Sequence, residues 1–174
     1  VYDSTGTPLA TAVGVLGNSN NVGLSAWWQP QDSGFVPSIS AGWGLSSTSG
    51  ADGVKLFGYE FDSATSQSWY VGLQWTDVFL KGNNLGMAVG QQAFVTGIDL
   101  SGEPVSAAWR SSSVAEDNLA RDGQSAWEFW YQFQVTDNIS VTPALFYLSR
   151  PLGAVTQGES FNQFGGLVKT SFRF

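Results

Sequence analysis

The chain contains no cysteine and no histidine among its 174 residues. Without cysteine it cannot form a disulfide, a thiolate metal site or a cysteine nucleophile. Without histidine it lacks the usual general base, the commonest zinc ligand and the acid–base partner of a serine triad. We therefore expect no enzyme activity, no metal site and no cofactor.

Charged residues are also scarce, and most of them are acidic. Seven Lys and Arg stand against 14 Asp and Glu, which gives a net charge of −7. Proteins that bind nucleic acids neutralise phosphates with clustered Lys and Arg. The sequence has no such stripe, so a nucleic-acid partner is not expected.

Long hydrophobic runs are missing as well, since the apolar stretches fall far short of the roughly 20 residues that a membrane helix needs. The sequence is instead rich in glycine, with 21 residues, and in aromatic side chains, with 8 Trp, 12 Phe and 5 Tyr. In membrane β-barrels, apolar and polar residues alternate, so hydropathy averaged over a window stays low. This composition favours an all-β chain in a membrane.

Alternation of apolar and polar residues recurs along most of the sequence. In the segment AWEFWYQFQVT (126–136), Trp127, Phe129 and Tyr131 share one face of a strand, and Glu128 and Gln132 lie on the other. Most such segments have about nine to eleven residues, the length with which a tilted strand crosses a bilayer. The pattern predicts eight strands, at 9–17, 22–29, 38–46, 68–75, 85–94, 126–136, 139–149 and 164–174.

The lengths of the connections also fit an outer-membrane barrel. If the chain ends on the periplasmic side, the short turns 30–36, 79–84 and 136–139 are periplasmic. The longer connections 48–67, 93–125 and 150–162 are then extracellular, with the short turn 18–21 as the exception. Short periplasmic turns and long outer loops are typical of bacterial outer-membrane barrels.

The same alternation would also suit a soluble β-sandwich, such as a carbohydrate-binding module, in which the aromatic faces pack on each other. Aromatic residues near the predicted strand ends favour the membrane interpretation, because they would form interfacial girdles. These residues are Trp28, Trp69, Trp75, Trp127 and Tyr147. A module should purify in plain buffer, whereas a membrane barrel should require detergent.

Three segments resemble the C-terminal half of the cyanobacterial outer-membrane porins in the carbohydrate-selective porin family. They are SWYVGLQWTDVFLKGNNLGMAVGQ (68–91), VTDNISVTPALFYLSRP (135–151) and FGGLVKTSFRF (164–174). The resemblance implies a trimeric, roughly 16-stranded antiparallel transmembrane barrel, of which residues 1–174 supply about eight strands as part of a single domain. It further implies that an N-terminal barrel half, and an S-layer-homology domain that binds the cell wall, lie outside this chain.

The function that the resemblance implies is passive diffusion. The barrel would form a water-filled channel for small hydrophilic solutes, such as sugars and inorganic ions, in the outer membrane of a Gram-negative-type bacterium, a cyanobacterium. The terminal strand, with Phe172 and Phe174, is similar to the signal that the barrel-assembly machinery reads in outer-membrane proteins. Its expected partners are therefore outer-membrane lipid, that machinery, further copies in a homotrimer and the solutes.

The candidate site residues lie on the polar face of the predicted strands and in one long loop. Amide and charged side chains toward a watery lumen suit hydrophilic solutes, although the same residues could serve only to hydrate the wall. The pore-lining candidates are Gln74, Glu128, Gln132, Gln134, Lys169 and Arg173. The loop 93–125 would narrow the lumen if it folded inward, or stay at the surface as a solvated loop; its constriction candidates are Arg110, Glu116, Asp117 and Arg121, and it also contains Asp122.

Overall fold

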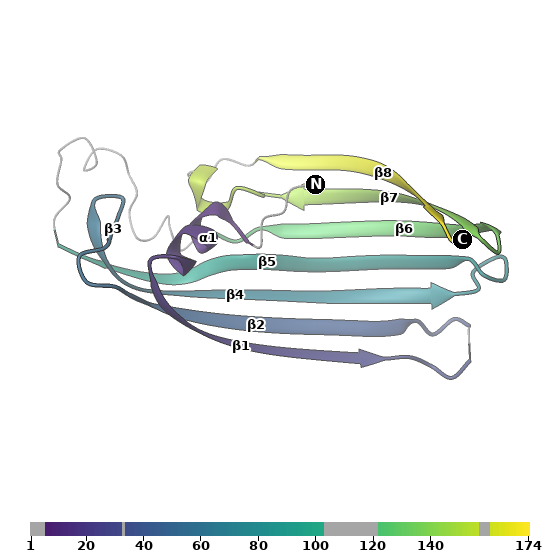
Figure 1. The fold of residues 1–174 in the computed structure, drawn as a ribbon, viewed down its shortest axis with the longest axis horizontal. Coiled ribbons are helices and arrows are strands. Elements are labelled where there is room, and N and C mark those ends of the chain that lie inside the picture. Colours follow the sequence, from purple (N-terminus) through teal and green to yellow (C-terminus); the bar gives the residue numbers. More distant parts are fainter. Residues whose placement is uncertain (1–5, 33, 103–121, 157–160) are drawn as a thin grey trace.

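The protein forms one antiparallel sheet with a short helix against one of its faces (Figure 1). The computed structural model describes residues 6–32, 34–102, 122–156 and 161–174. The strands are β1 (Gly17–Trp28), β2 (Ser38–Gly50), β3 (Lys55–Leu56), β4 (Tyr59–Thr76), β5 (Asn84–Ser101), β6 (Ser125–Thr136), β7 (Ile139–Ser149) and β8 (Asn162–Phe172). The helices are α1 (Pro8–Gly14) and the 3-10 turn η1 (Gly153–Thr156).

The strands follow one another across the sheet in sequence order, from β1 through β2, β4, β5, β6 and β7 to β8, and β3 pairs with β4. The prediction of an all-β antiparallel architecture is confirmed. The sheet is open, with β1 and β8 at its two ends. Within the described residues, no helix is long and apolar enough to cross a membrane.

The register of the ladders fixes which side chains share a face. Trp43 of β2 pairs with Trp69 of β4, and the neighbouring Gly42 pairs with Tyr70 on the opposite face. The apolar face carries, from β1 to β8, Leu24, Trp43, Val71, Val89, Phe129, Leu145 and Val168. The polar face carries Ser25, Gly42, Tyr70, Gly90, Glu128, Phe146 and Lys169.

The expected strand at 9–17 is wrong, because most of these residues belong to α1, which ends at Gly14, and β1 begins only at Gly17. Thr7 caps the helix by accepting a hydrogen bond from the Ala10 N–H at 3.1 Å, and Pro8 occupies the first helical position. Leu9 and Val13 lie four residues apart, so they share the face of the helix that is buried. The turn expected at 18–21 is also wrong, since β1 runs through it from Gly17 to Trp28.

Two of the long connections are shorter than the sequence predicted. β2 continues to Gly50, β4 begins at Tyr59 and β5 continues to Ser101, so much of 48–67 and the first part of 93–125 are strand. The added residues are rich in Ser, Thr and Gly and lack a clear apolar alternation. They are held by pairing with each other, with register shifts between Phe61 and Ser63 and between Gln67 and Trp69.

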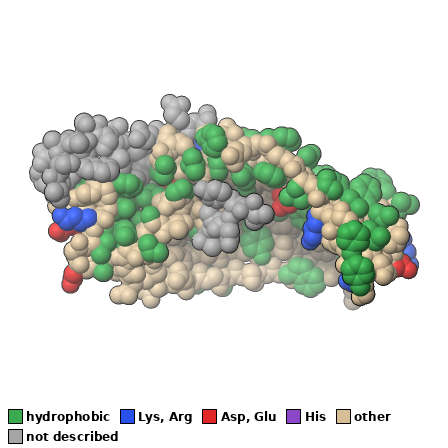
Figure 2. Space-filling model, turned by 45° about the horizontal axis from the view of Figure 1, so that its top comes forward, with side chains coloured by type: hydrophobic (Ala, Val, Ile, Leu, Met, Phe, Trp, Pro, Cys, Tyr) green, Lys and Arg blue, Asp and Glu red, His purple; other side chains and the backbone are tan. Residues whose placement is uncertain are grey.

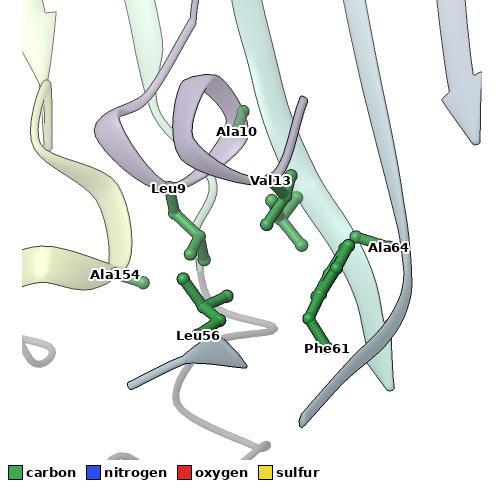
Figure 3. Close-up of a cluster of buried hydrophobic side chains, with 8 residues drawn as sticks. Leu9, Ala10, Val13, Leu56, Phe61, Ala64 and Ala154 are labelled. Carbon is green, nitrogen blue, oxygen red and sulfur yellow. The ribbon is translucent and has the colours of Figure 1, made fainter. Parts of the chain in front are cut away.

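The hydrophobic core lies under α1, near the end of the sheet that carries the long connections. Figure 3 shows Leu9 and Val13 of the helix directed toward the side of Leu56, Phe61 and Ala64, with Ala154 of η1 beside Leu56. Ala10 belongs to the same buried cluster. Ala64 pairs with Thr48, six residues beyond Gly42 on β2, so it belongs to the polar face. The helix therefore covers the polar face of the sheet.

Next to this core, the pairing between β5 and β6 ends. The ladder between β5 and β6 runs from Asn84–Gln132 to Gly90–Ala126. Beyond it, Gly6 bridges Ala93 in parallel, and the Thr7 N–H donates to the Ala93 carbonyl at 2.8 Å. The segment before α1 thus pairs with β5 at Ala93, where β6 no longer does.

The short turns and the end of β8 lie together at the opposite end of the sheet (Figure 1). There the buried Asn83, 4 % exposed, joins the β4–β5 turn to β6. Its amide donates to the Tyr131 hydroxyl at 3.0 Å and accepts from the Gln134 N–H at 2.8 Å. The Tyr131 hydroxyl in turn donates to the Val78 carbonyl at 2.8 Å.

Replacing Asn83 with Ala is expected to lower the free energy of unfolding by about 1–3 kcal/mol, because two hydrogen bonds of a buried amide are lost. Denaturant titration of the protein in lipid vesicles, followed by tryptophan fluorescence, measures the change. The matched control is Asn84→Ala, whose amide makes only a long contact of 3.5 Å to Gln132. Equal losses for the two variants would contradict the role assigned to Asn83.

Candidate pore lining

The apolar face is exposed over most of its width. Its exposed large side chains reach 74 % at Phe164, and others, such as Leu73 and Val89 near the centre of the sheet, are half-buried. No charged residue occurs on the strands within 22–28, 39–45, 69–75, 85–89, 127–135, 139–147 and 164–172 except Glu128 and Lys169, both on the polar face. Most of the charged side chains visible in Figure 2 lie near the two ends of the molecule.

Aromatic side chains border this apolar band on both sides. Toward the short turns lie Trp28 and Trp75, and the indole N–H of Trp75 donates to the Phe35 carbonyl at 2.9 Å. Toward the long connections, Trp69 pairs with Trp43, and its N–H donates to the Gln91 amide at 2.6 Å. Six residues separate Trp69 from Trp75, about 20 Å along the strand. This is comparable to the apolar band of an outer-membrane barrel, roughly 25 Å tall.

The polar face is built largely from small residues, and three of its aromatic rings lie over glycines of a neighbouring strand. Tyr70 lies over Gly42, Trp130 over Gly86 and Phe146 over Gly165. A Cβ atom at any of these glycines would meet the ring, so the rings can lie against the wall only because the glycines have no side chain.

A groove of about 880 Å³ runs along this face. Its floor is formed by small residues such as Gly42, Gly90 and Ala88, and Tyr70, Glu128 and Phe146 also line it. The groove reaches Ala93, the residue to which the segment before α1 is bonded. The small residues of the floor leave open space above this part of the sheet, and Leu148 and Leu167 also border it.

Of the candidate residues, Glu128 and Lys169 lie on the polar face, on β6 and β8. Lys169 pairs with Thr142 and Glu128 with Phe146. Because Phe146 pairs with Gly165, Lys169 lies four residues along β8 from the row of Glu128 and two strands away. That is about 13 Å along the strands and 10 Å across them, so the two charges are not partners.

The amide candidates lie on the polar face toward the short turns. Gln74 pairs with Gly86, and Gln132 pairs with Asn84. The Gln134 amide donates to the Thr136 carbonyl at 2.5 Å. Their role in lining a pore, like that of Glu128 and Lys169, stays a prediction.

The end of β8 is tied to the β6–β7 turn. The Arg173 N–H donates to the Asn138 carbonyl at 2.9 Å, and the Asn138 amide donates to the Arg173 carbonyl at 2.9 Å. Phe172 pairs with Ile139 on the apolar face, and Phe174 is fully exposed. The part of Phe172 and Phe174 in assembly stays a prediction. The constriction candidates Arg110, Glu116, Asp117 and Arg121 lie outside the described residues.

Asp122, in the connection 93–125, was not singled out as a site residue from the sequence, although it is fully buried. The carboxylate of Asp122 accepts hydrogen bonds from the Thr7 hydroxyl, from the Val95 N–H at 2.9 Å and from the Ala154 N–H at 2.9 Å. Burial raises the pKa of Asp122, while these hydrogen bonds and the charge of Arg150 act in the opposite direction. Gly153 lies so close to Asp122 that a side chain there would collide with it, and its φ of 54° also favours glycine.

Sequence reasoning missed Asp122 because its partners lie 115, 27 and 32 residues away. Alternation places Phe146 on the face opposite Leu145, but the sequence did not single it out as a lining residue, since both faces of its segment are rich in apolar side chains. The position is distinguished only by Gly165, which lies opposite Phe146 on β8, and that partner is known only once the strand register is known.

Comparison with known proteins agrees with this geometry. Residues 5–174 match the family described as carbohydrate-selective porin, OprB family. An uncharacterized protein, sll0772, of the cyanobacterium Synechocystis sp. is 31 % identical over 144 residues, which cover 81 % of this chain and 23 % of that protein. This chain therefore spans about a quarter of the length of that relative. No solved structure matches this chain significantly. The match over residues 5–174 shows that the chain belongs to the carbohydrate-selective porin, OprB, family.

Proposed function

We propose that the chain forms part of the wall of a water-filled pore in the bacterial outer membrane, through which small hydrophilic solutes such as sugars and inorganic ions diffuse passively. The polar face would line the water and the apolar face would contact lipid. The observation that carries the proposal is the separation of the two faces in a sheet one layer thick. Membership of the porin family and similarity to a cyanobacterial protein support the location.

The soluble sandwich that the sequence left open is less consistent with this architecture. A sandwich buries the apolar face of one sheet against a second sheet. Here the strands that the structure describes form a single sheet, and Phe129, Leu145 and Val168 on its apolar face are exposed to 49 %, 53 % and 69 %. Such a surface is stable where hydrocarbon covers it.

Liposome swelling tests the proposal. Vesicles that contain the intact protein are expected to swell when small neutral sugars are added outside, and to swell more slowly as the sugar becomes larger. Vesicles prepared with heat-unfolded protein serve as the control. Purification as a stable monomer in detergent-free buffer, together with an absence of swelling, would contradict a pore and favour the sugar-binding module.

A further inference from the structure

The helix α1 occupies a position that matters for any solute moving along the polar face. It packs on that face through Leu9, Ala10 and Val13, against Ala64 and Val95. The segment before it is bonded to Ala93, which lines the groove. The helix therefore stands at the end of the groove nearest the long connections.

The contacts that hold α1 come from three separate parts of the chain. Asp122 accepts from Thr7 at the start of the helix, from Val95 of β5 and from Ala154 of η1. Thr7 and Asp122 are both 0 % exposed. A fully buried carboxylate requires such donors to offset its lost hydration, so this arrangement is stable only while all three segments stay together.

The helix itself brings no charge to the groove. Its sequence, PLATAVG, contains neither acidic nor basic residues, and its exposed positions include Pro8, Thr11 and Gly14. An uncharged obstacle fixed to a pore wall limits the size of what passes and has little effect on the sign of its charge.

We propose that α1 is a size-limiting element of the pore, and that Asp122 is the positioning residue that holds it over the polar face. This inference rests on the proposed function. The helix would narrow the passage at the end of the sheet with the long connections, and the groove next to it has a floor of small residues such as Gly42, Ala88 and Gly90. Release of the Thr7–Asp122 hydrogen bond should let α1 leave the wall and raise the size limit.

The first measurement follows the helix directly. Residues 1–174 contain no cysteine, so Val13→Cys introduces a single reporter in this chain at a position that is 1 % exposed. In the intact protein its labelling by a membrane-impermeant maleimide should be slow. Adding Thr7→Val, which keeps the size of the side chain but removes the hydroxyl, is expected to raise the labelling rate about 10-fold, a factor that corresponds to roughly 1.4 kcal/mol.

Three controls separate release of the helix from general loosening. Thr7→Ser keeps the hydroxyl and should label as slowly as the parent. Thr11→Val makes the same chemical change at an exposed site of the same helix and should also leave labelling unchanged. A reporter at Val15, which is 80 % exposed, should label rapidly in every background.

The second measurement follows the pore. In planar bilayers, single-channel conductance is recorded with polyethylene glycols of graded size, and polymers that enter the pore lower it. Thr7→Val is expected to admit polymers that the parent and Thr11→Val exclude. Asp122→Asn provides a second variant for the case that Thr7→Val does not fold. Its side-chain NH2 group takes the place of one carboxylate oxygen and cannot accept the hydrogen bonds which that oxygen accepts.

The outcomes are distinguishable. Faster labelling with an unchanged exclusion size would overturn the size-limiting role, and unchanged labelling in both variants would overturn the role of Asp122. If the parent protein conducts no ions at all, the proposed function fails, and the size-limiting role fails with it. In that case the labelling rates still show whether Asp122 holds the helix.

Discussion

Arginine in place of Leu73 is expected to reduce the free energy of unfolding in lipid vesicles by about 2–4 kcal/mol, the cost of a cation on the lipid face near the middle of the bilayer. Leu73 pairs with Ile39 and Met87, and all three lie on the apolar face. Val71 and Trp75, each two residues away from Leu73 along β4, lie on the same apolar face. The charge would therefore be placed among hydrocarbon chains, with no carboxylate on that face of the band.

The neighbouring residue offers a matched control. Gln74 has nearly the same depth on the same strand, but it is exposed on the polar face and pairs with Gly86. Gln74→Arg is expected to change the free energy of unfolding by less than about 1 kcal/mol, because its guanidinium can stay in water. Denaturant titrations of both variants in the same vesicles give the comparison. Equal costs at the two positions would show that the faces do not divide lipid from water.

This division of faces is the part of the structure that the sequence predicted best. Side chains alternate along a strand with a fixed period of two, so identifying one face residue assigns its whole strand. The predicted apolar row of Trp127, Phe129 and Tyr131 is the observed one, and the register adds only which row of the next strand lies beside it. The sequence of each strand was sufficient there, because its own alternation of apolar and polar residues assigns both faces.

The sequence was a poorer guide where a segment's structure depends on distant partners. Residues 9–17 combine a short apolar run with no strong period, and such runs do not distinguish a strand from a helix. The Thr7–Pro8 start signal was present, but what stabilises a seven-residue helix is its packing on β4 and β5. The extensions of β4 and β5 are likewise held by their mutual ladder rather than by an apolar pattern.

Among the site residues, the same distinction applies. Lys169 and Glu128 could be placed on the polar face by alternation alone. The glycines beneath Tyr70, Trp130 and Phe146 could not be assigned a purpose, because each lies on a different strand from the ring that covers it. Asp122 was one charged residue among several in a long loop, and nothing local indicates that it is buried.

Changing Lys169 to Glu is expected to shift the zero-current potential of the reconstituted pore in a KCl gradient toward cation selectivity. Lys169 is exposed on the polar face and pairs with Thr142, and the distance to Glu128 leaves its charge free to act on the lumen. The screening length is about 8 Å at physiological ionic strength and about 30 Å at 0.01 M. The shift should therefore grow as the salt concentration falls.

Two further positions test whether location on the wall decides the effect. Arg173 lies four residues beyond Lys169, about 13 Å further along the strand, where the chain leaves the sheet beside Asn138. Arg173→Glu should shift the potential less, because the mouth of a pore is wider and better screened. Lys55→Glu, on β3 beyond the groove, makes the same charge change at an exposed site and should shift it least. If Lys55→Glu moves the potential as much as Lys169→Glu does, the effect comes from net charge and Lys169 does not line the conducting path.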